Sequence, residues 1–332
     1  MTNGNSIKRR TFLQASVAAS AGASTAADGL ADNSIVENGM PYGMIGDIKI
    51  SRLILGSNVM GGGAHSRDLV YVRKLMSLYN TQDRLLNVLK TAEAQGINTI
   101  LQGNANLVNN YNAEFDGHMQ QIRPLKMTQD DTTETIQQKF DEFLKQSGPL
   151  VYVMGDTGDQ MTRDGRVDII AKALDIAKKS GVVCGVGGHS LGVVKACEEQ
   201  ELKPAFYVKT FHHDQYWSAT PKGNRKDFCW YDDKGGNSYS GVQLDHGEFH
   251  DNIWCLDPEE TIEVMQKVSV PWLAFKVLAA GAISPTSGFK YALQNGADFM
   301  AVGMLDFQIE EDAAIFKGMY ARGIKRQRPW RA

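Results

Sequence analysis

The segment from Lys209 to Asp214, which reads Lys-Thr-Phe-His-His-Asp, gathers a lysine, two histidines and an aspartate within six residues. It ends a short apolar run and opens a stretch that returns to a regular pattern only near Asp257. That stretch carries four of the seven histidines and three of the five tryptophans. Loops longer than about 12 to 15 residues in compact domains are commonly lids or binding loops. We therefore expect residues 211–257 to form a lid-like insertion over a site.

The elements that would position these residues repeat eight times from residue 51 onward. Alternating strands and helices predict a parallel sheet, and eight units predict a closed (β/α)8 TIM barrel with a long loop after its sixth strand. A doubly wound open sheet is the alternative. The expected strands are 51–55, 98–102, 122–126, 150–154, 182–186, 205–209, 272–277 and 299–303. The expected helices are 82–95, 107–119, 132–147, 167–180, 191–200, 258–267, 288–295 and 310–322.

The first 27 residues have the pattern of a targeting segment. Arg9 and Arg10 are followed by Thr-Phe-Leu and then by a run of small residues through Ala27. This order resembles a twin-arginine export signal, which implies a periplasmic or otherwise exported protein and the twin-arginine export machinery as a partner. A disordered tail with a chance arginine pair is the alternative. Residues 28–50 would form the mature N-terminal segment, with a hairpin near residues 44–50 closing the bottom of the barrel at 51–332.

Composition excludes several classes of protein. With 42% hydrophobic and 22% charged residues, the chain is neither disordered nor fibrous. The formal charge of −3 gives no basis for nucleic-acid binding, and the basic run 325–331 is expected to be a solvated tail. After the first 27 residues, no stretch reaches the roughly 18 to 20 apolar residues of a membrane span. Of the four cysteines, Cys229 and Cys255 lie in the insertion and are either bridged or free.

Alternation along each strand predicts which side chains face the pore, because successive side chains point to opposite faces. An ammonium facing the helices would be buried without a partner, so Lys209 is expected to point inward, with His213 on the same side. In the seventh strand the same reasoning turns Trp272, Ala274 and Lys276 inward. Catalytic groups in barrels come from such strand ends and the loops after them. The predicted catalytic residues are Asp156, His189, Lys209, His213 and Lys276.

A ring of acids, bases and cations suits proton abstraction next to the carbonyl of a sugar. A carboxylate or imidazole would remove the proton, and a lysine would stabilise the enolate, which gives isomerisation or β-elimination. A divalent ion of the zinc or manganese type could assist, because imidazole and carboxylate groups are its ligands. The predicted ligands are His213, Asp214, His246, Glu248 and His250. The predicted substrate-binding residues are Gln102, Lys126, Trp217, Trp230 and Trp254.

Three segments resemble the aldo-keto reductase superfamily: Ile50–Ser57, Ala94–Thr99 and Cys184–Gly188. The resemblance implies the same barrel and hydride transfer from a nicotinamide, with a tyrosine acid supported by lysine, aspartate and histidine. Lys126 matches the lysine. The stretch after the second strand lacks the aspartate and tyrosine, with Tyr111 displaced, and Gly155-Asp156 stands where the histidine belongs.

The reductase tetrad is therefore not retained, and an oxidoreductase with tightly bound NAD(P) is an alternative to the isomerase or lyase. The chain with its export signal also resembles a group of exported, aldo-keto-reductase-like barrel proteins associated with bacterial carbohydrate use. Two further alternatives stay open. A lysine could form a Schiff base with a carbonyl substrate, or the protein could bind sugars without turning them over.

Overall fold

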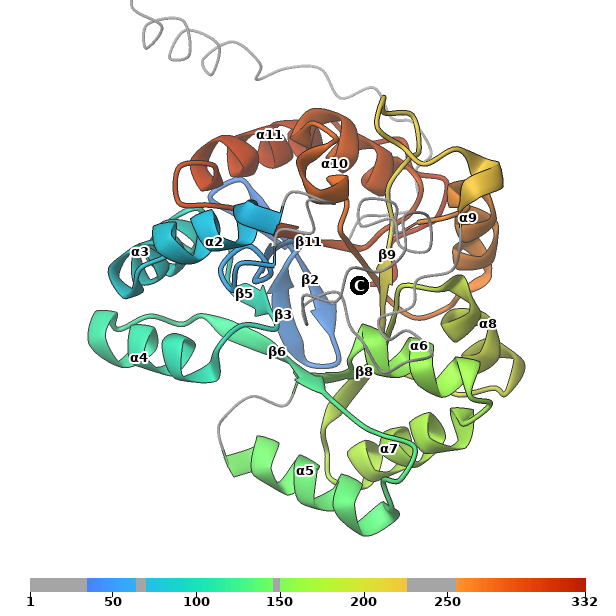
Figure 1. The fold of residues 1–332 in the computed structure, drawn as a ribbon. Helices are drawn as coiled ribbons and strands as arrows, with labels where there is room; N and C mark the ends of the chain where they lie inside the picture. Colours follow the sequence, from blue (N-terminus) through green and yellow to red (C-terminus); the bar gives the residue numbers. More distant parts are fainter. Residues whose placement is uncertain (1–34, 64–69, 146–149, 226–254) are drawn as a thin grey trace, which may run out of the picture. The chain divides into compact units, whose positions relative to one another are not determined.

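The computed structural model describes residues 35–63, 70–145, 150–225 and 255–332, which belong to one compact unit. Eight parallel strands close into a barrel in chain order, with the last strand paired to the first, and helices surround it (Figure 1). This confirms the predicted (β/α)8 TIM barrel. The strands are β4 (Leu53–Gly56), β5 (Thr99–Leu101), β6 (Gln120–Leu125), β7 (Leu150–Val153), β8 (Val183–Gly188), β9 (Tyr207–Thr210), β10 (Trp272–Phe275) and β11 (Phe299–Gly303).

Each of the eight expected helices is present, with ends shifted by a few residues. They are α3 (Gln82–Ala94), α4 (Ala105–Phe115), α5 (Thr133–Lys145), α7 (Val167–Lys179), α8 (Leu191–Glu199), α9 (Pro258–Lys267), α10 (Pro285–Gln294) and α11 (Ile309–Ala321). The sequence did not predict α2 (Val70–Tyr79) or α6 (Gly155–Arg163). Two glycines in the first turn of α6 hide it from a propensity argument, because glycine is among the poorest helix formers. None of the described helices is long and apolar enough to cross a membrane.

Two apolar clusters define the inside and the outside of the barrel. Tyr152 belongs to the inner cluster and Val151 and Val153 to the outer one, as alternation predicts for β7. In β9 and β10 the prediction is wrong, because Val208 and Leu273 are the inward residues there. Parallel strands are apolar on both faces, so alternation alone does not say which set points inward.

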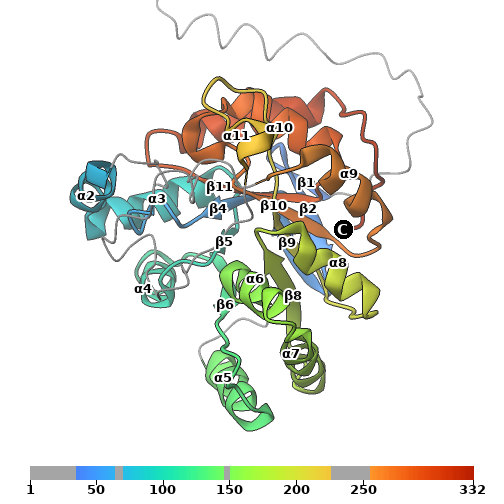
Figure 2. The same ribbon diagram turned by 45° about the vertical axis from the view of Figure 1, so that its right-hand side comes forward.

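A small antiparallel sheet closes the bottom of the barrel. It consists of β1 (Ile35–Glu37), β2 (Met40–Ile45) and β3 (Ile48–Ser51), and the β2–β3 hairpin is the one expected near residues 44–50. Ile45 and Ile50 belong to the inner cluster, so the hairpin packs against the barrel interior. Both views show these strands across one end of the barrel (Figure 2).

The basic C-terminal run is not the solvated tail that the sequence suggested. Arg328 is fully buried, and its guanidinium lies 2.6 Å from the Asp298 carboxylate. Trp330 lies between the guanidinium groups of Arg52 and Arg326, at 3.8 and 3.4 Å from its ring centre. Pairing with a buried carboxylate and stacking on an aromatic ring offset the cost of burying these cations. The tail is part of the folded barrel.

Candidate functional site

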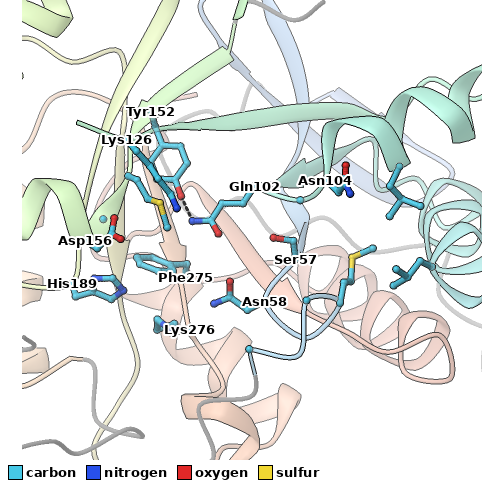
Figure 3. A pocket seen from close by; sticks show the side chains of 18 of the residues that line it. Ser57, Asn58, Gln102, Asn104, Lys126, Tyr152, Asp156, His189, Phe275 and Lys276 are labelled. Carbon is cyan, nitrogen blue, oxygen red and sulfur yellow. Dashed lines mark hydrogen bonds between the residues drawn. The ribbon is translucent and has the colours of Figure 1, made fainter. Parts of the chain in front are cut away.

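A pocket of about 600 Å³ opens at the carboxyl ends of the barrel strands, where active sites of this fold lie. Its wall combines residues from the loops after β4, β5, β6, β7, β8 and β10 (Figure 3). The side chains at the centre of the wall are mostly polar or charged, whereas those at the edge nearest α3 and α4 are apolar. Its lining residues include Ser57, Asn58, Arg73, Gln102, Lys126, Tyr152, Asp156, His189, Phe275 and Lys276.

Five residues predicted from the sequence meet in this pocket. Gln102 and Lys126 come from the ends of β5 and β6, Asp156 from the first turn of α6, His189 from the end of β8, and Lys276 from the end of β10. Three of them were predicted as catalytic and two as substrate-binding. The structure therefore brings together the polar ring that the strand ends implied.

Lys209 and His213 do not line this pocket. Lys209 shares the outward face of β9 with Tyr207, whose hydroxyl donates to Glu198 on α8. The Lys209 ammonium donates to the Thr210 carbonyl (2.8 Å) and to the Thr210 hydroxyl (2.7 Å). The prediction that Lys209 points inward is wrong, because these hydrogen bonds give an outward-facing ammonium its partners. His213 is turned toward α10, where its Nε2 lies 2.9 Å from the Ser287 hydroxyl.

The predicted metal ligands are only partly within the described residues. Asp214 forms an ion pair with Arg225 at 2.9 Å, and His213 is engaged by Ser287. His246, Glu248 and His250 lie outside the described residues, as do Trp230, Trp254 and Cys229. Where the structure is described, no three His, Cys, Asp or Glu side chains are grouped to hold a metal. A metal site therefore stays a prediction.

The described ends of the insertion are held to each other. Buried His212 contacts the His213 carbonyl through Nδ1 (2.8 Å) and accepts the Cys255 N–H at Nε2 (3.2 Å). Arg225 donates to the Leu256 carbonyl at 2.5 Å. Trp217, a predicted substrate-binding residue, is 99% exposed and away from the pocket wall. Cys255 is a free, buried thiol, which is the unbridged alternative.

His189 is oriented by Asp159, a residue that the sequence argument did not nominate. One carboxylate oxygen of Asp159 lies 2.7 Å from His189 Nδ1. The same carboxylate accepts the main-chain N–H groups of His189 (3.0 Å) and Ser190 (2.9 Å). Because its oxygens accept these hydrogen bonds, His189 Nδ1 is the ring nitrogen that carries the hydrogen. The neutral ring then carries its lone pair on Nε2.

Glycines allow α6 to carry Asp159 close enough to His189. A Cβ at Gly158 would lie 2.1 Å from the Gly187 carbonyl oxygen, so only glycine permits this contact between α6 and β8. A Cβ at Gly155 would lie 3.2 Å from the His189 ring. The Gly-Asp-Thr-Gly-Asp sequence at 155–159 was therefore the available signal for the acid partner, once the helix is known.

Burial lowers the pKa of His189 below its usual value, and the neighbouring Asp159 carboxylate opposes the shift. Lys276 and Lys209 lower it further, because a second positive charge nearby disfavours imidazolium. The pKa and the Asp159 contact together describe a neutral imidazole that can accept a proton. This is the arrangement of a general base.

Tyr152 provides a protonated hydroxyl at the centre of the pocket. Its oxygen accepts a hydrogen bond from the Gln102 side-chain amide (Figure 3). Burial raises the pKa of Tyr152, the Gln102 hydrogen bond lowers it, and the Asp156 carboxylate raises it. Because the oxygen is an acceptor toward Gln102, the hydroxyl proton is directed elsewhere. Tyr152 was not among the predicted site residues.

Gln102 and Lys276 reach the pocket through an unusual backbone. Their φ angles are 63° and 58°, in the left-handed region that non-glycine residues rarely adopt. Such residues carry strain of about 1 to 3 kcal/mol and are concentrated at functional sites. The left-handed turn breaks the alternation of β10, which explains why Phe275 and Lys276 both line the pocket.

A second pocket of about 360 Å³ adjoins the first and shares part of its wall, including Phe275 and Lys276. It lies over the ends of β4, β10 and β11 and is mainly apolar, with Val72, Met76 and Leu278 among its lining residues. The turn at 279–281 lines it and has three successive positive φ angles, from 44° to 88°. The two pockets form one cleft with a polar and an apolar half.

Comparisons with known proteins place the fold. No family model and no curated protein matches this sequence. A proposed aldo-keto reductase from Pseudomonas aeruginosa has a TM-score of 0.54 at 15% identity, over 86% of this chain and 95% of that one. A crystal structure of a proposed aldo-keto reductase from the same organism gives 0.54 at 14% identity, over 83% and 95%. At such low identity, the likeness shows that this barrel shares its fold with those proteins.

Proposed function

We propose that this protein is an oxidoreductase that interconverts a carbonyl and an alcohol on a sugar, with a tightly bound nicotinamide cofactor. The observation that carries the proposal is the adjacency of the two pockets across Phe275 and Lys276. The polar pocket holds the proton-handling groups Tyr152 and His189, and the apolar pocket beside it has room for a flat ring. The likeness in fold favours this reaction over isomerisation or elimination, although fold alone does not define a reaction.

The residues of the apolar pocket fit the nicotinamide part of such a cofactor. The Phe275 ring offers an apolar face, and Lys276 offers a cation toward the phosphates. Ala279 and Ala280 hold the main chain in a left-handed turn, whose amide groups are suited to anions. When bound there, the cofactor would supply or accept a hydride, the chemistry that the protein itself lacks.

The polar pocket would handle the proton. The Tyr152 hydroxyl, fixed by Gln102, would donate a hydrogen bond to the substrate oxygen and stabilise its negative charge. His189, held by Asp159, would take the proton of the substrate hydroxyl in oxidation and return it in reduction. This arrangement differs from the reductase tetrad, since Tyr111 is buried outside the pocket and donates to Glu93.

The second candidate is proton abstraction beside a sugar carbonyl, leading to isomerisation or β-elimination. It is favoured by the position of Lys276 near His189, where it lowers the imidazole pKa. His189 would remove a carbon-bound proton, and Lys276 would stabilise the enolate oxygen. Both candidates use His189 as the base. In the first a hydride leaves the substrate carbon, and in the second a proton leaves it.

A single incubation separates these candidates. Purified protein would be mixed with sugars and keto-sugars in deuterated water, with and without added nicotinamide nucleotide. The oxidoreductase predicts a change in reduced-nicotinamide absorbance and no deuterium beside the carbonyl. Deuterium incorporation without that change supports the second candidate. Binding without any turnover would contradict both.

A further inference from the structure

We infer that Lys209 and Thr210 are positioning residues for His189, the base of the proposed reaction. Their role rests on the proposed function of the pocket, although neither residue lines its wall. Both stand at the end of β9 and are buried, with exposed fractions of 1% and 0%. Lys209 was predicted to act on the substrate directly, and the structure instead connects it to the base.

Two hydrogen bonds make this connection. The Lys209 ammonium donates to Thr210 Oγ1 at 2.7 Å, and Thr210 Oγ1 donates to the main-chain carbonyl of His189 at 2.9 Å. An ammonium can only donate, so the hydroxyl accepts from it and keeps its single hydrogen for the carbonyl. Lys209 thereby fixes the direction in which the Thr210 hydroxyl points.

The hydroxyl holds His189 at the point where the sheet ends. The pairing of β8 with β9 runs as far as Gly188 and Lys209, one residue before His189. Beyond it, Asp159 accepts the main-chain N–H of His189 at 3.0 Å and contacts its ring at 2.7 Å. Thr210 binds the carbonyl of the same residue from β9. With both main-chain groups held, the ring keeps its direction toward the pocket, and such support is what a reacting group needs to stay in a productive geometry.

Lys209 also influences the charge of the ring. The titratable groups that α6, β7, β9 and the end of β10 bring near His189, in the part of the chain that the structure describes, are Asp156, Asp159, Tyr152, Lys209 and Lys276 (Figure 3). Burial lowers the pKa of His189 most, the Asp159 carboxylate opposes the shift, and the two lysines lower it further. A cation on the β9 side therefore favours the neutral imidazole, which is the form that accepts a proton.

Thr210→Val tests the hydrogen bond, because valine keeps the shape of the side chain and removes the hydroxyl. We expect kcat to fall about tenfold with little change in KM, since a displacement of about 1 Å costs up to roughly 10²-fold in rate. Thr210→Ser keeps the hydroxyl and should restore kcat. Thr99→Val is the matched control, because Thr99 is also buried in a barrel strand and its hydroxyl binds Asn98, away from the pocket.

Nuclear magnetic resonance of the His189 ring tests the same hydrogen bond without turnover. The resonance of the Nδ1–H that faces Asp159 should shift in Thr210→Val and stay in place in Thr210→Ser and Thr99→Val. A group that only stabilises the fold would change the melting temperature and leave this resonance where it is.

Lys209→Met tests the charge. Removing a cation that disfavours imidazolium should raise the pKa of His189 in a resonance titration. His189 must be neutral to act as the base, so the acid limb of the pH–kcat/KM profile should move to higher pH. Lys172→Met is the control, since Lys172 pairs with Asp168 on α7, outside the pocket wall. If Lys209→Met does not fold, the two Thr210 variants decide alone.

Wild-type kcat and an unmoved Nδ1–H resonance in Thr210→Val would overturn the role of Thr210. So would a loss of kcat that Thr210→Ser fails to restore. An unchanged or lower His189 pKa in Lys209→Met would overturn the role of Lys209. Absence of turnover in the wild type would contradict the proposed function alone, because the resonance measurements report on His189 without a substrate.

Discussion

Asp159 and His189 form a buried acid–imidazole pair, with 2.7 Å between a carboxylate oxygen and Nδ1. The pair joins the first turns of α6 to the end of β8 and fixes both the ring orientation and its tautomer. A partner of this kind keeps the opposite nitrogen, Nε2, available as the proton acceptor. The proposed chemistry depends on this relationship.

Replacing Asp159 by Asn should lower kcat about 10²- to 10⁴-fold, because an amide no longer enforces the productive tautomer. It should also shift the acid limb of the pH–kcat/KM profile to lower pH. The Asp159 carboxylate opposes the lowering of the His189 pKa, so its loss makes imidazolium less favourable. Steady-state kinetics from pH 4 to 8, at about unit intervals, would measure both effects.

Asp164→Asn is the matched control for that variant. Asp164 ends α6, is exposed, and receives hydrogen bonds from Gln160. Its rate and pH profile should equal those of the wild type. An Asp159→Asn protein with wild-type kcat and an unshifted acid limb would remove His189 from the mechanism.

Replacing Tyr152 by Phe should lower kcat by a similar 10²- to 10⁴-fold, with little change in fold. The hydroxyl is lost while the ring keeps its place in the inner cluster, so apolar packing is retained. Tyr207→Phe is the control, because that buried hydroxyl donates to Glu198 on the outer side of β9. A Tyr152→Phe enzyme as fast as the control would show that the phenol does not act on the substrate.

Gly155→Ala tests the position of the His189 ring. A Cβ there would lie 3.2 Å from ring carbon Cε1 and 3.3 Å from Nδ1, which pushes the imidazole by a few tenths of an ångström. Displacements of about 1 Å cost up to roughly 10²-fold in rate, so we expect a loss of about tenfold. The melting temperature should change little. Gly318→Ala on α11 is the control, since its nearest neighbour would be 3.4 Å away at the end of the Arg322 side chain.

His212 should make stability depend on pH through the anchoring of the insertion. Burial lowers its pKa to about 4, and the hydrogen bond to the His213 carbonyl opposes the shift. An unfolded histidine titrates near pH 6.5, so between about pH 6.5 and 4 the unfolded state binds a proton that the folded state does not. The free energy of unfolding should therefore fall by up to about 3 kcal/mol over that range and level off below it.

Urea unfolding at several pH values would measure this dependence. His212→Gln removes the titrating ring, so its stability should be lower at pH 7 and fall less steeply as the solution is acidified. Identical slopes in the wild type and the variant would show that His212 does not titrate on unfolding.

The barrel and much of the polar ring follow from the sequence because each depends on local order. Eight apolar runs separated by amphipathic stretches have few other arrangements, and residues just after strands must meet at one end of the barrel. Gln102, Lys126 and Asp156 were predicted by that rule together with alternation along the strands. The position of Phe275 beside these polar residues was not predicted, since it depends on the left-handed backbone of the residue at position 276.

The errors have a common physical cause. The placement of Lys209 assumed an outward ammonium without partners, and the protein supplies oxygen acceptors from Thr210. Asp159 was missed because the glycines of α6 argue against a helix at this position. In the structure these glycines permit the close contact between α6 and β8. In both cases a tertiary contact overrides the local rule.

Hydride transfer between a nicotinamide and a sugar carbonyl is tested most directly by a rapid-mixing experiment that follows reduced-nicotinamide absorbance. The protein, loaded with one equivalent of the reduced cofactor, would be mixed with a keto-sugar. We predict loss of about one equivalent of reduced nicotinamide per site in the wild type, and a rate lower by about 10²-fold or more in Asp159→Asn. Conversion of the sugar with no change in that absorbance would contradict it.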